Sequence, residues 1–456
     1  MDVGGGERNG QAGERIASRL SRWRRGVIFA LLAAAIVERV AWSVASSAWS
    51  AGGEAFLVAY AFSQGHGFAS AYGLDHGATA HLLPISPGLA GTVYWLLGYT
   101  PLAELVLAAW SIGLALGSYL LLDRAFARLG VGVGPRLLAL AFLCLAPTYI
   151  AQEAVDFRVW EGGLAAFLSA LMLDQALAAD REDAPRRHVH VVIATAPLLF
   201  FVNPLMGAAA FLSLALLWAG RVPLGVLARR MTMSVLLLAM FVVPWAIRNQ
   251  RVLGEPVLLR SNAGLELALA HYPGVPVRGD RDDAFVARLH AIHPLQSREA
   301  RATMVARGGE LAYSRALGNE AMATIAANPG RAVAVMLAHV GDMITPGPWI
   351  FRIWGIQGLA PIQSALATMV GLLGIGGLIA GLGLGGRRWL FVAIPIIVPV
   401  LAVAPFQPVM RYTYLIYAPL AFCGACGLSL LVEHFRRQLR RRRSSGSATG
   451  DTSAAR

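Results

Sequence analysis

Long apolar runs, separated by short arginine-rich segments, dominate the pattern of this chain. Runs of about 16 to 23 apolar residues match the length that a helix needs to cross a bilayer. Ten such runs lie near residues 27–47, 102–122, 135–151, 160–178, 189–203, 204–220, 231–247, 362–384, 389–405 and 411–432. The pattern predicts an all-α polytopic membrane protein with about ten transmembrane helices.

Two further apolar segments, 86–99 and 332–346, are short for a membrane span. Counting only one of them would move several arginine clusters to the opposite side of the membrane, against the positive-inside rule. We therefore expect interfacial or re-entrant helices there, at the outer face.

The arginine clusters predict the orientation. With ten spans, all six clusters fall on one side, including the cluster at Arg15–Arg25 and the tail at Arg436–Arg443. Both termini are then cytoplasmic, and two long regions, 48–101 and 248–361, face outward. The predicted divisions are a basic N-terminus (1–25), a transmembrane core with the first outer loop 48–101 (26–247), a small α-helical outer cap (248–361), C-terminal transmembrane helices (362–432) and a basic, disordered tail (433–456).

Composition supports a membrane protein. Hydrophobic residues make up 56% of the chain, charged residues 14%, and the mean hydropathy is +0.57, so the polar surface is too small for a soluble body of 456 residues. The net charge of +13 lies in clusters beside apolar runs, which favours anionic lipid headgroups over nucleic acid as the partner. All basic residues are arginine, which fits a GC-rich bacterial genome. The expected location is the bacterial inner membrane. The three cysteines lie within predicted spans, where helix packing is the expected role.

The first outer region holds a candidate general base. Glu54 follows Gly52 and Gly53 directly after the first span. Its carboxylate is placed to accept a proton from an acceptor hydroxyl or amine, or simply to interact with a helix N-terminus. Asp75, His76 and His81 then form a cluster that suits a divalent cation, the one cofactor this region suggests, although solvated loop residues would follow the same pattern.

A dense polar segment follows the third span. Asp156 and Glu161 flank Arg158 and Trp160. The acids either neutralise Arg158 or orient a sugar, and Trp160 alone is typical of an anchor at the membrane interface.

The third group of candidate site residues contains arginines at the outer ends of predicted spans, where the positive-inside rule disfavours them. Guanidinium groups bind phosphate through paired hydrogen bonds and stay charged at any relevant pH, although arginines at span ends also extend toward headgroups. The candidates for binding a lipid phosphate and its substrate are Arg248, Asn249, Arg260, Asn262, Glu266 and Arg411.

These motifs, in this order, resemble the GT-C membrane glycosyltransferases. The likeness is to bacterial family 39-like transferases, in the superfamily of protein O-mannosyltransferases and lipid A aminoarabinose transferases, and it runs from about residue 26 to 430. It rests on Glu54, Ala59, Gly65-His66-Gly67-Phe68, Thr79 to Pro84, Trp160-Glu161, Asn203-Pro204, Pro244 to Asn249, Arg260 to Glu266, Gly309-Glu310 with Tyr313.

The resemblance implies a polyprenyl-phosphate-linked donor of a hexosyl or pentosyl group, inversion at the sugar carbon, and a lipid, glycan or protein acceptor on the outer face. It places His66 and His81 at the substrate. The family's usual catalytic aspartate in the first loop is replaced by Glu54 after two glycines. If Glu54 is structural, Asp75 is the alternative base.

Two other functions stay open on the residues alone. Many spans with boundary charges also suit a transporter or lipid flippase, although Glu38 and Arg39 are the only charged residues well inside a predicted span. A catalytically inactive scaffold related to these transferases is the second alternative.

Overall fold

The structure is a computed structural model, which describes residues 5–45, 52–73, 77–181, 183–277, 279–352 and 357–447. This part of the chain is α-helical, with one isolated β-bridge between Ala69 and Ala78. Its α-helices are α1 (Gly5–Ala45), α2 (Gly53–Ser63), α3 (Ile85–Leu97), α4 (Pro101–Arg128), α5 (Val133–Leu145), α6 (Ile150–Ala154), α7 (Gly162–Ala179), α8 (Arg186–Val202), α9 (Pro204–Trp218), α10 (Leu224–Leu253), α11 (Ala263–Ala270), α12 (Arg281–Ile292), α13 (Arg298–Ala306), α14 (Glu310–Ala327), α15 (Pro329–Ile344), α16 (Ala360–Gly385), α17 (Leu390–Val403) and α18 (Met410–Ser447).

Six segments of the described residues are long and apolar enough to cross a membrane, and the number rises to eight if each of two bent helix pairs is one span. The six are Arg22–Ala45, Pro101–Arg128, Gly162–Ala179, Leu224–Leu253, Ala360–Val403 and Met410–Glu433. The predicted all-α polytopic membrane fold is therefore confirmed. The total of ten spans stays a prediction, because α8 and α9 have only 17 and 15 residues.

The two short apolar segments behave differently from the long helices. Residues 86–99 overlap α3, an apolar helix of 13 residues. Residues 332–346 overlap α15, which joins α14 at a bend of 110°. Neither is a long straight helix, as expected for segments too short to span alone.

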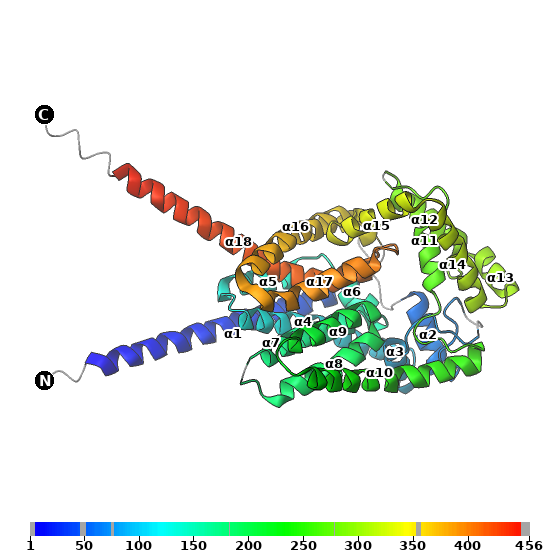
Figure 1. Ribbon diagram of the computed structural model, residues 1–456, viewed down its shortest axis with the longest axis horizontal. Helices are drawn as coiled ribbons and strands as arrows, with labels where there is room; N and C mark the ends of the chain where they lie inside the picture. Colours follow the sequence, from blue (N-terminus) through cyan, green and yellow to red (C-terminus); the bar gives the residue numbers. More distant parts are fainter. Residues whose placement is uncertain are drawn as a thin grey trace.

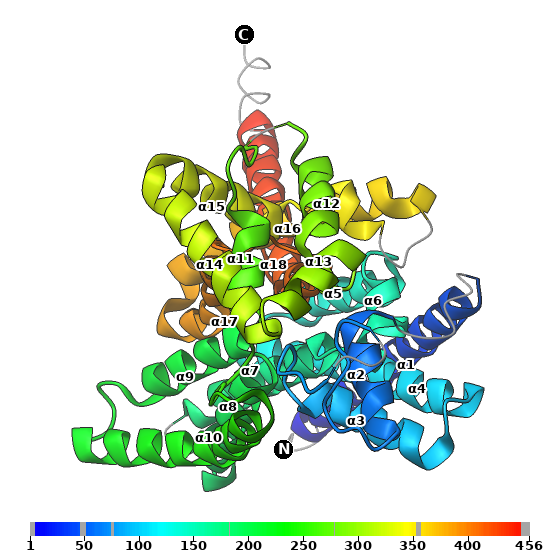
Figure 2. The same cartoon turned by 90° about the vertical axis from the view of Figure 1, so that its right-hand side faces the viewer.

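The long helices form a bundle, and the helices of the predicted cap gather at one end of it. Figure 1 shows the start of α1 and the end of α18 at one end of the molecule and α11 to α14 at the other. The view from that end, in Figure 2, shows α2 beside these four helices. The segments 48–101 and 248–361, far apart in sequence, therefore meet at the same end of the bundle.

Glycines allow the C-terminal helices to pack closely. A Cβ atom on Gly377 of α16 would lie 1.9 Å from the carbonyl oxygen of Cys423 in α18, and one on Gly371 would lie 1.9 Å from that of Ile344. Small residues at such contacts let helix backbones approach in a membrane, where van der Waals packing drives association. Cys423 is a buried, free thiol at this contact, which confirms its predicted role in helix packing.

The opposite end of the bundle contains buried carboxylates paired with arginines, most of which belong to the predicted clusters. Each of three aspartates contacts two arginines. The groups are Asp123 with Arg24 and Arg136, Asp174 with Arg124 and Arg128, and Asp180 with Arg221 and Arg388. Pairing makes these buried charges tolerable, so the clusters stabilise helix contacts as well as carrying net charge.

Candidate active site

A cavity of about 220 Å³ lies where the two long loop regions meet. Its walls come from the first turn of α2, from α6 and the residues before α7, from α11 and α12, and from the start of α18. The lining residues are Gly52, Gly53, Glu54, His81, Gln152, Asp156, Trp160, Glu266, Leu269, Phe285, Leu289, His293, Leu295, Gln296, Val409, Met410, Arg411 and Tyr412. Five residues predicted from the sequence line it, namely Glu54, His81, Asp156, Glu266 and Arg411.

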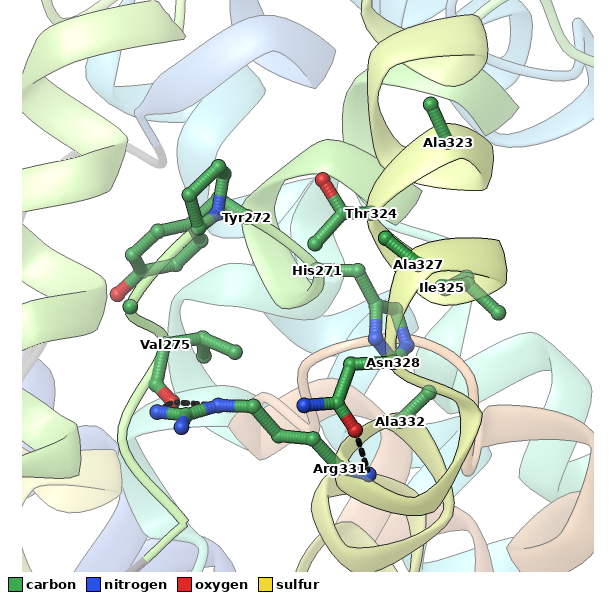
Figure 3. Close-up of a pocket in the computed structure, with 12 residues that line it drawn as sticks. His271, Tyr272, Val275, Ala323, Thr324, Ile325, Ala327, Asn328, Arg331 and Ala332 are labelled. Atoms are coloured by element: carbon green, nitrogen blue, oxygen red, sulfur yellow. Dashed lines mark hydrogen bonds between the residues drawn. The ribbon is translucent and has the colours of Figure 1, made fainter.

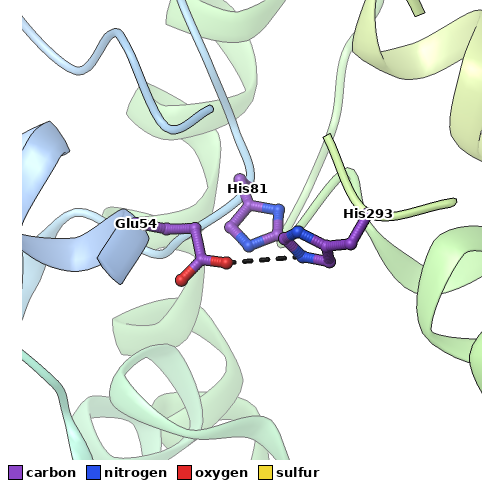
Figure 4. A group of neighbouring side chains, drawn as sticks. All are labelled: Glu54, His81 and His293. Carbon is purple, nitrogen blue, oxygen red and sulfur yellow. Dashed lines mark ion pairs between the residues drawn. The ribbon is translucent and has the colours of Figure 1, made fainter. Parts of the chain in front are cut away.

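Glu54 faces a histidine that the sequence analysis did not select. Its Oε1 lies 3.3 Å from Nε2 of His293, which follows α12 (Figure 4). The backbone N–H of Leu295 donates to Nδ1 of the same ring, at 3.3 Å. Because Nδ1 accepts, the neutral ring carries its proton on Nε2 and directs it at Glu54. The position of Glu54 in the first turn of α2 also favours its negative charge.

His81 is buried beside this pair. Its Nδ1 lies 2.8 Å from the hydroxyl oxygen of Tyr72, and its ring centroid lies 6.2 Å from that of His293. Burial lowers the pKa of His81 well below its usual value, and the neighbouring His293 lowers it further. Burial also raises the pKa of Tyr72. His81 is therefore neutral at neutral pH and offers Nε2 toward Glu54 and His293.

These three residues are also a candidate metal group. One ligand atom each from Glu54, His81 and His293 lie within 4.8 Å of one another. A histidine that binds a metal through Nε2 carries its proton on Nδ1, whereas Nδ1 of His293 accepts a hydrogen bond. The arrangement fits a Glu54–His293 hydrogen-bonded pair better than a metal centre. Asp75 and His76, from the predicted cation cluster, lie outside the described residues.

Arg411 has a free guanidinium edge in the cavity. Its Cζ lies 3.5 Å from the ring centroid of Trp160, and it forms no hydrogen bond or ion pair with any described residue. Trp160 is only 4% exposed, so its interpretation as an interface anchor is wrong, because the ring is buried as a platform for Arg411. The stacked face leaves the N–H groups available to a ligand.

Arg260 and Glu161 form an ion pair beside the cavity, with 2.5 Å between Nη2 and Oε1. Burial raises the pKa of Glu161, but Arg260 and Arg411 lower it more, so the net pKa lies below the usual value. Nε of Arg260 is buried and has no hydrogen-bond partner in the described part of the chain. Glu161 does not neutralise Arg158, which pairs instead with Glu104 at 2.9 Å.

Glu266 projects from α11 into the same cavity. Nδ2 of Asn262 donates to its Oε1 at 3.0 Å, so Asn262 positions a cavity residue and does not itself line the cavity. Burial raises the pKa of Glu266.

Arg248, Asn249 and His66 do not line the cavity. Arg248 donates to the carbonyl oxygens of Phe68 and Thr79, and at 2.8 Å to Oδ1 of Asn249. Nδ2 of Asn249 donates to the carbonyl oxygen of Val257 at 2.8 Å, and His66 is exposed. Arg248 therefore holds Phe68 and Thr79 against the end of α10, and Asn249 holds Val257 there.

A larger hollow of about 450 Å³ lies elsewhere among the cap helices, near the junction of α14 and α15 (Figure 3). None of the predicted site residues lines it. Its most prominent polar side chains bind the protein itself: Nε of Arg331 donates to the carbonyl oxygen of Val275 at 3.0 Å, and Oδ1 of Asn328 accepts from the backbone N–H of Arg331. The smaller cavity is the better candidate for chemistry.

Comparison with known proteins supports the fold assignment. No family model and no curated protein matches the sequence. The archaeal oligosaccharyltransferase AglB from Archaeoglobus fulgidus, solved in complex with an inhibitory peptide and a dolichol-phosphate, aligns over 92% of this chain and 52% of its own, with a TM-score of 0.50 and 15% sequence identity. The apo form of the Archaeoglobus fulgidus oligosaccharyltransferase aligns with a TM-score of 0.47 and 13% identity, over 92% and 52% of the two chains.

The chain thus spans about half the length of these solved proteins. At this level of identity the likeness concerns the fold alone. The chain has a GT-C fold, similar to that of AglB, as the order of its motifs predicted.

Proposed function

We propose that this protein is a membrane glycosyltransferase that transfers one sugar from a polyprenyl phosphate to a nucleophilic acceptor. The observation that carries the proposal is one cavity that contains both the Glu54–His293 pair and the guanidinium edge of Arg411, which has no hydrogen-bond partner among the described residues. A phosphate-binding group and a general base are the two parts that such a transfer requires.

In the proposed complex, Arg411 binds the phosphate of the donor. Its stacking on Trp160 holds the guanidinium plane and leaves donors for a paired contact. Arg260 adds positive charge beside it and is positioned by Glu161. The AglB neighbour was solved with a dolichol-phosphate, which supports a lipid phosphate as the ligand class.

Glu54 then acts as the general base. It accepts the proton of the acceptor hydroxyl or amine while the acceptor atom bonds to the anomeric carbon. The bond between that carbon and the phosphate oxygen breaks, and the phosphate leaves with the electron pair. Attack opposite the leaving group inverts the anomeric carbon. Asp156 lines the same cavity and is proposed to orient the acceptor.

The cavity size favours a single sugar. Pockets for drug-sized molecules enclose roughly 300 to 1,000 Å³, and this cavity holds about 220 Å³. A monosaccharide fits such a volume. The proposed sugar is a hexosyl or pentosyl group, and the lipid remains in the membrane.

The proposed setting is the bacterial inner membrane, with both termini cytoplasmic and the cavity outward. The arginine clusters support this orientation, because they lie at the end of the bundle opposite the cavity. The acceptor is then a lipid, glycan or protein at the outer face.

The direct test is sugar transfer by the purified protein in liposomes, with a panel of polyprenyl-phosphate sugars and envelope extract as acceptor. We expect transfer from one donor class, with release of polyprenyl phosphate. Transfer from no donor, together with movement of lipid or solute across the bilayer, would replace the proposal with the transporter alternative. Donor binding without transfer or flux would favour the inactive scaffold.

A further inference from the structure

Gln152 is a buried residue with an unused hydrogen-bonding group in the cavity. It belongs to the short helix α6, is 2% exposed and lines the cavity wall. Its side-chain oxygen Oε1 is buried and has no partner among the described residues. A buried acceptor left unpaired is unfavourable by about 1–3 kcal/mol, so such groups usually have a partner when the protein is in its working state.

The neighbouring residue, Glu153, fixes the position of α6. The Glu153 carboxylate accepts from Nε of Arg39 at 2.6 Å, from the Tyr414 hydroxyl at 3.1 Å, and from the Tyr119 hydroxyl. Ser111 donates to the backbone oxygen of Glu153 at 2.7 Å. These bonds join α6 to α1, α4 and α18, and hold Gln152 against the cavity.

A buried ion pair such as Arg39–Glu153 is weak evidence for stability, because desolvation offsets much of the attraction. Its effect here is geometric. It fixes α6 to α1, and the Tyr414 hydroxyl, which donates to the same Glu153 carboxylate, fixes α6 to α18, the helix whose first turn carries Arg411 and Tyr412. The cavity wall that contains Gln152 and the wall that contains Arg411, the proposed phosphate-binding residue, therefore keep a fixed relative position.

The cavity contains donors, such as Arg411 and His293, but no described residue donates to Gln152 Oε1. Glu54, Asp156 and Glu266 are carboxylates, which only accept hydrogen bonds when ionised. With Gln152 Oε1 they give the cavity several acceptors for a ligand. A ligand that matches this lining carries several donors, as the hydroxyl groups of a sugar do.

We propose that Gln152 is a specificity-determining residue that accepts a hydrogen bond from one hydroxyl group of the transferred sugar. The inference rests on the proposed function and identifies a residue that recognises the sugar. A buried polar group that loses its partner discriminates strongly against the analogue that lacks it. The donor with this hydroxyl is therefore preferred over the corresponding deoxy donor by between about fivefold and about 150-fold in kcat/KM.

The test combines Gln152→Met with a series of donors that each lack one hydroxyl. Methionine has nearly the same length and no strong acceptor. In the wild type, removing one particular hydroxyl lowers kcat/KM by the factor given above. In Gln152→Met, the ratio of kcat/KM between the donor with that hydroxyl and the donor without it falls close to 1. The ratios for the other hydroxyl positions stay as in the wild type.

Gln363→Met is the matched control. Gln363 is also a buried glutamine with an unpaired Oε1, but its Nε2 donates to the carbonyl oxygen of Pro147 at 2.7 Å, and it does not line the cavity. Its substitution lowers stability and leaves the preference among donors unchanged. If Gln152→Met does not fold, Gln152→Asn, which retracts the amide by one methylene, loses the same preference.

The outcomes distinguish a failure of the proposed function from a failure of the proposed role of Gln152. A wild type that transfers no sugar contradicts the proposed function. A wild type that transfers sugar, with the same preferences in folded Gln152→Met or Gln152→Asn as in the wild type, contradicts only the role of Gln152. A loss of preference in Gln363→Met equal to that in Gln152→Met contradicts it as well.

Discussion

Oε1 of Glu54 and Nε2 of His293 lie 3.3 Å apart, although the two residues belong to the first and the second long loop regions. The hydrogen bond from the backbone of Leu295 to Nδ1 directs the proton of His293 at the carboxylate. The base proposed for the reaction is therefore oriented by a residue from the cap, and catalysis depends on the docking of the cap against the first loop.

Replacing His293 tests this orientation. In His293→Phe, we expect kcat to fall roughly ten- to 150-fold with little change in donor KM, because a hydrogen bond to a charged group contributes about 1.5–3 kcal/mol. Because His293 is a positioning residue, the loss falls on kcat and not on donor KM. Steady-state kinetics measures both. The exposed His290 on the same helix is the control, as His290→Phe; equal losses in the two variants would refute the role of His293.

Substitutions of Arg411 and of Arg248 are predicted to have different effects. Arg411→Ala weakens binding of polyprenyl phosphate by roughly ten- to 150-fold, because it removes charged hydrogen bonds to the ligand. Arg248→Ala instead lowers the unfolding temperature, because the carbonyl oxygen of Thr79 loses its side-chain donor and that of Phe68 keeps only the backbone N–H of Thr79. Binding and thermal unfolding, measured on both variants in detergent, distinguish the roles. Unchanged ligand affinity in folded Arg411→Ala would rule out this phosphate site.

Acid is predicted to destabilise the protein through His81. The pKa of His81 in the folded protein lies well below the usual 6.5, so below pH 6.5 the unfolded chain binds a proton that the folded chain does not. The contribution is fully present above pH 6.5 and is lost as pH falls toward the folded pKa. The drop in unfolding temperature between about pH 7.5 and about pH 5.5 should be smaller in His81→Gln than in the wild type. An equal or larger drop in the variant would show that His81 is not held neutral.

Chelation separates the two interpretations of the residues around Glu54. The hydrogen bonding of His293 favours the Glu54–His293 pair over a metal centre. We therefore expect transfer to continue in the presence of EDTA. Activity that is lost on chelation and restored by one divalent cation would instead place a metal among Glu54, His81 and His293.

The fold was predictable from the sequence because its signals are local. Apolar runs identify the long helices, and the arginine clusters between them indicate which side of the membrane each connection occupies. The shorter segments were harder. Residues 189–203 and 204–220 each have the composition of a span, yet form helices below full crossing length, with a proline inside α8 and another at the start of α9.

The site was only partly predictable, because its geometry is not local. Motifs in sequence order selected Glu54, Asp156, Glu266 and Arg411, which do line one cavity. They also selected Arg248, whose position at a span end resembles that of Arg411 but whose donors go to loop carbonyl oxygens. His293 was missed, because a histidine before a proline at the end of α12 has no spacing that relates it to Glu54. Gln152 was missed because only burial reveals that its oxygen lacks a partner.

The most direct test of the account is to compare the wild type with Glu54→Gln in liposomes, measuring sugar transfer and polyprenyl phosphate binding on the same samples. Glutamine keeps the shape of the side chain and cannot accept the acceptor proton. The account predicts that Glu54→Gln binds the lipid phosphate as the wild type does and transfers sugar on the order of 10²- to 10⁴-fold more slowly. Transfer at the wild-type rate by Glu54→Gln would contradict it.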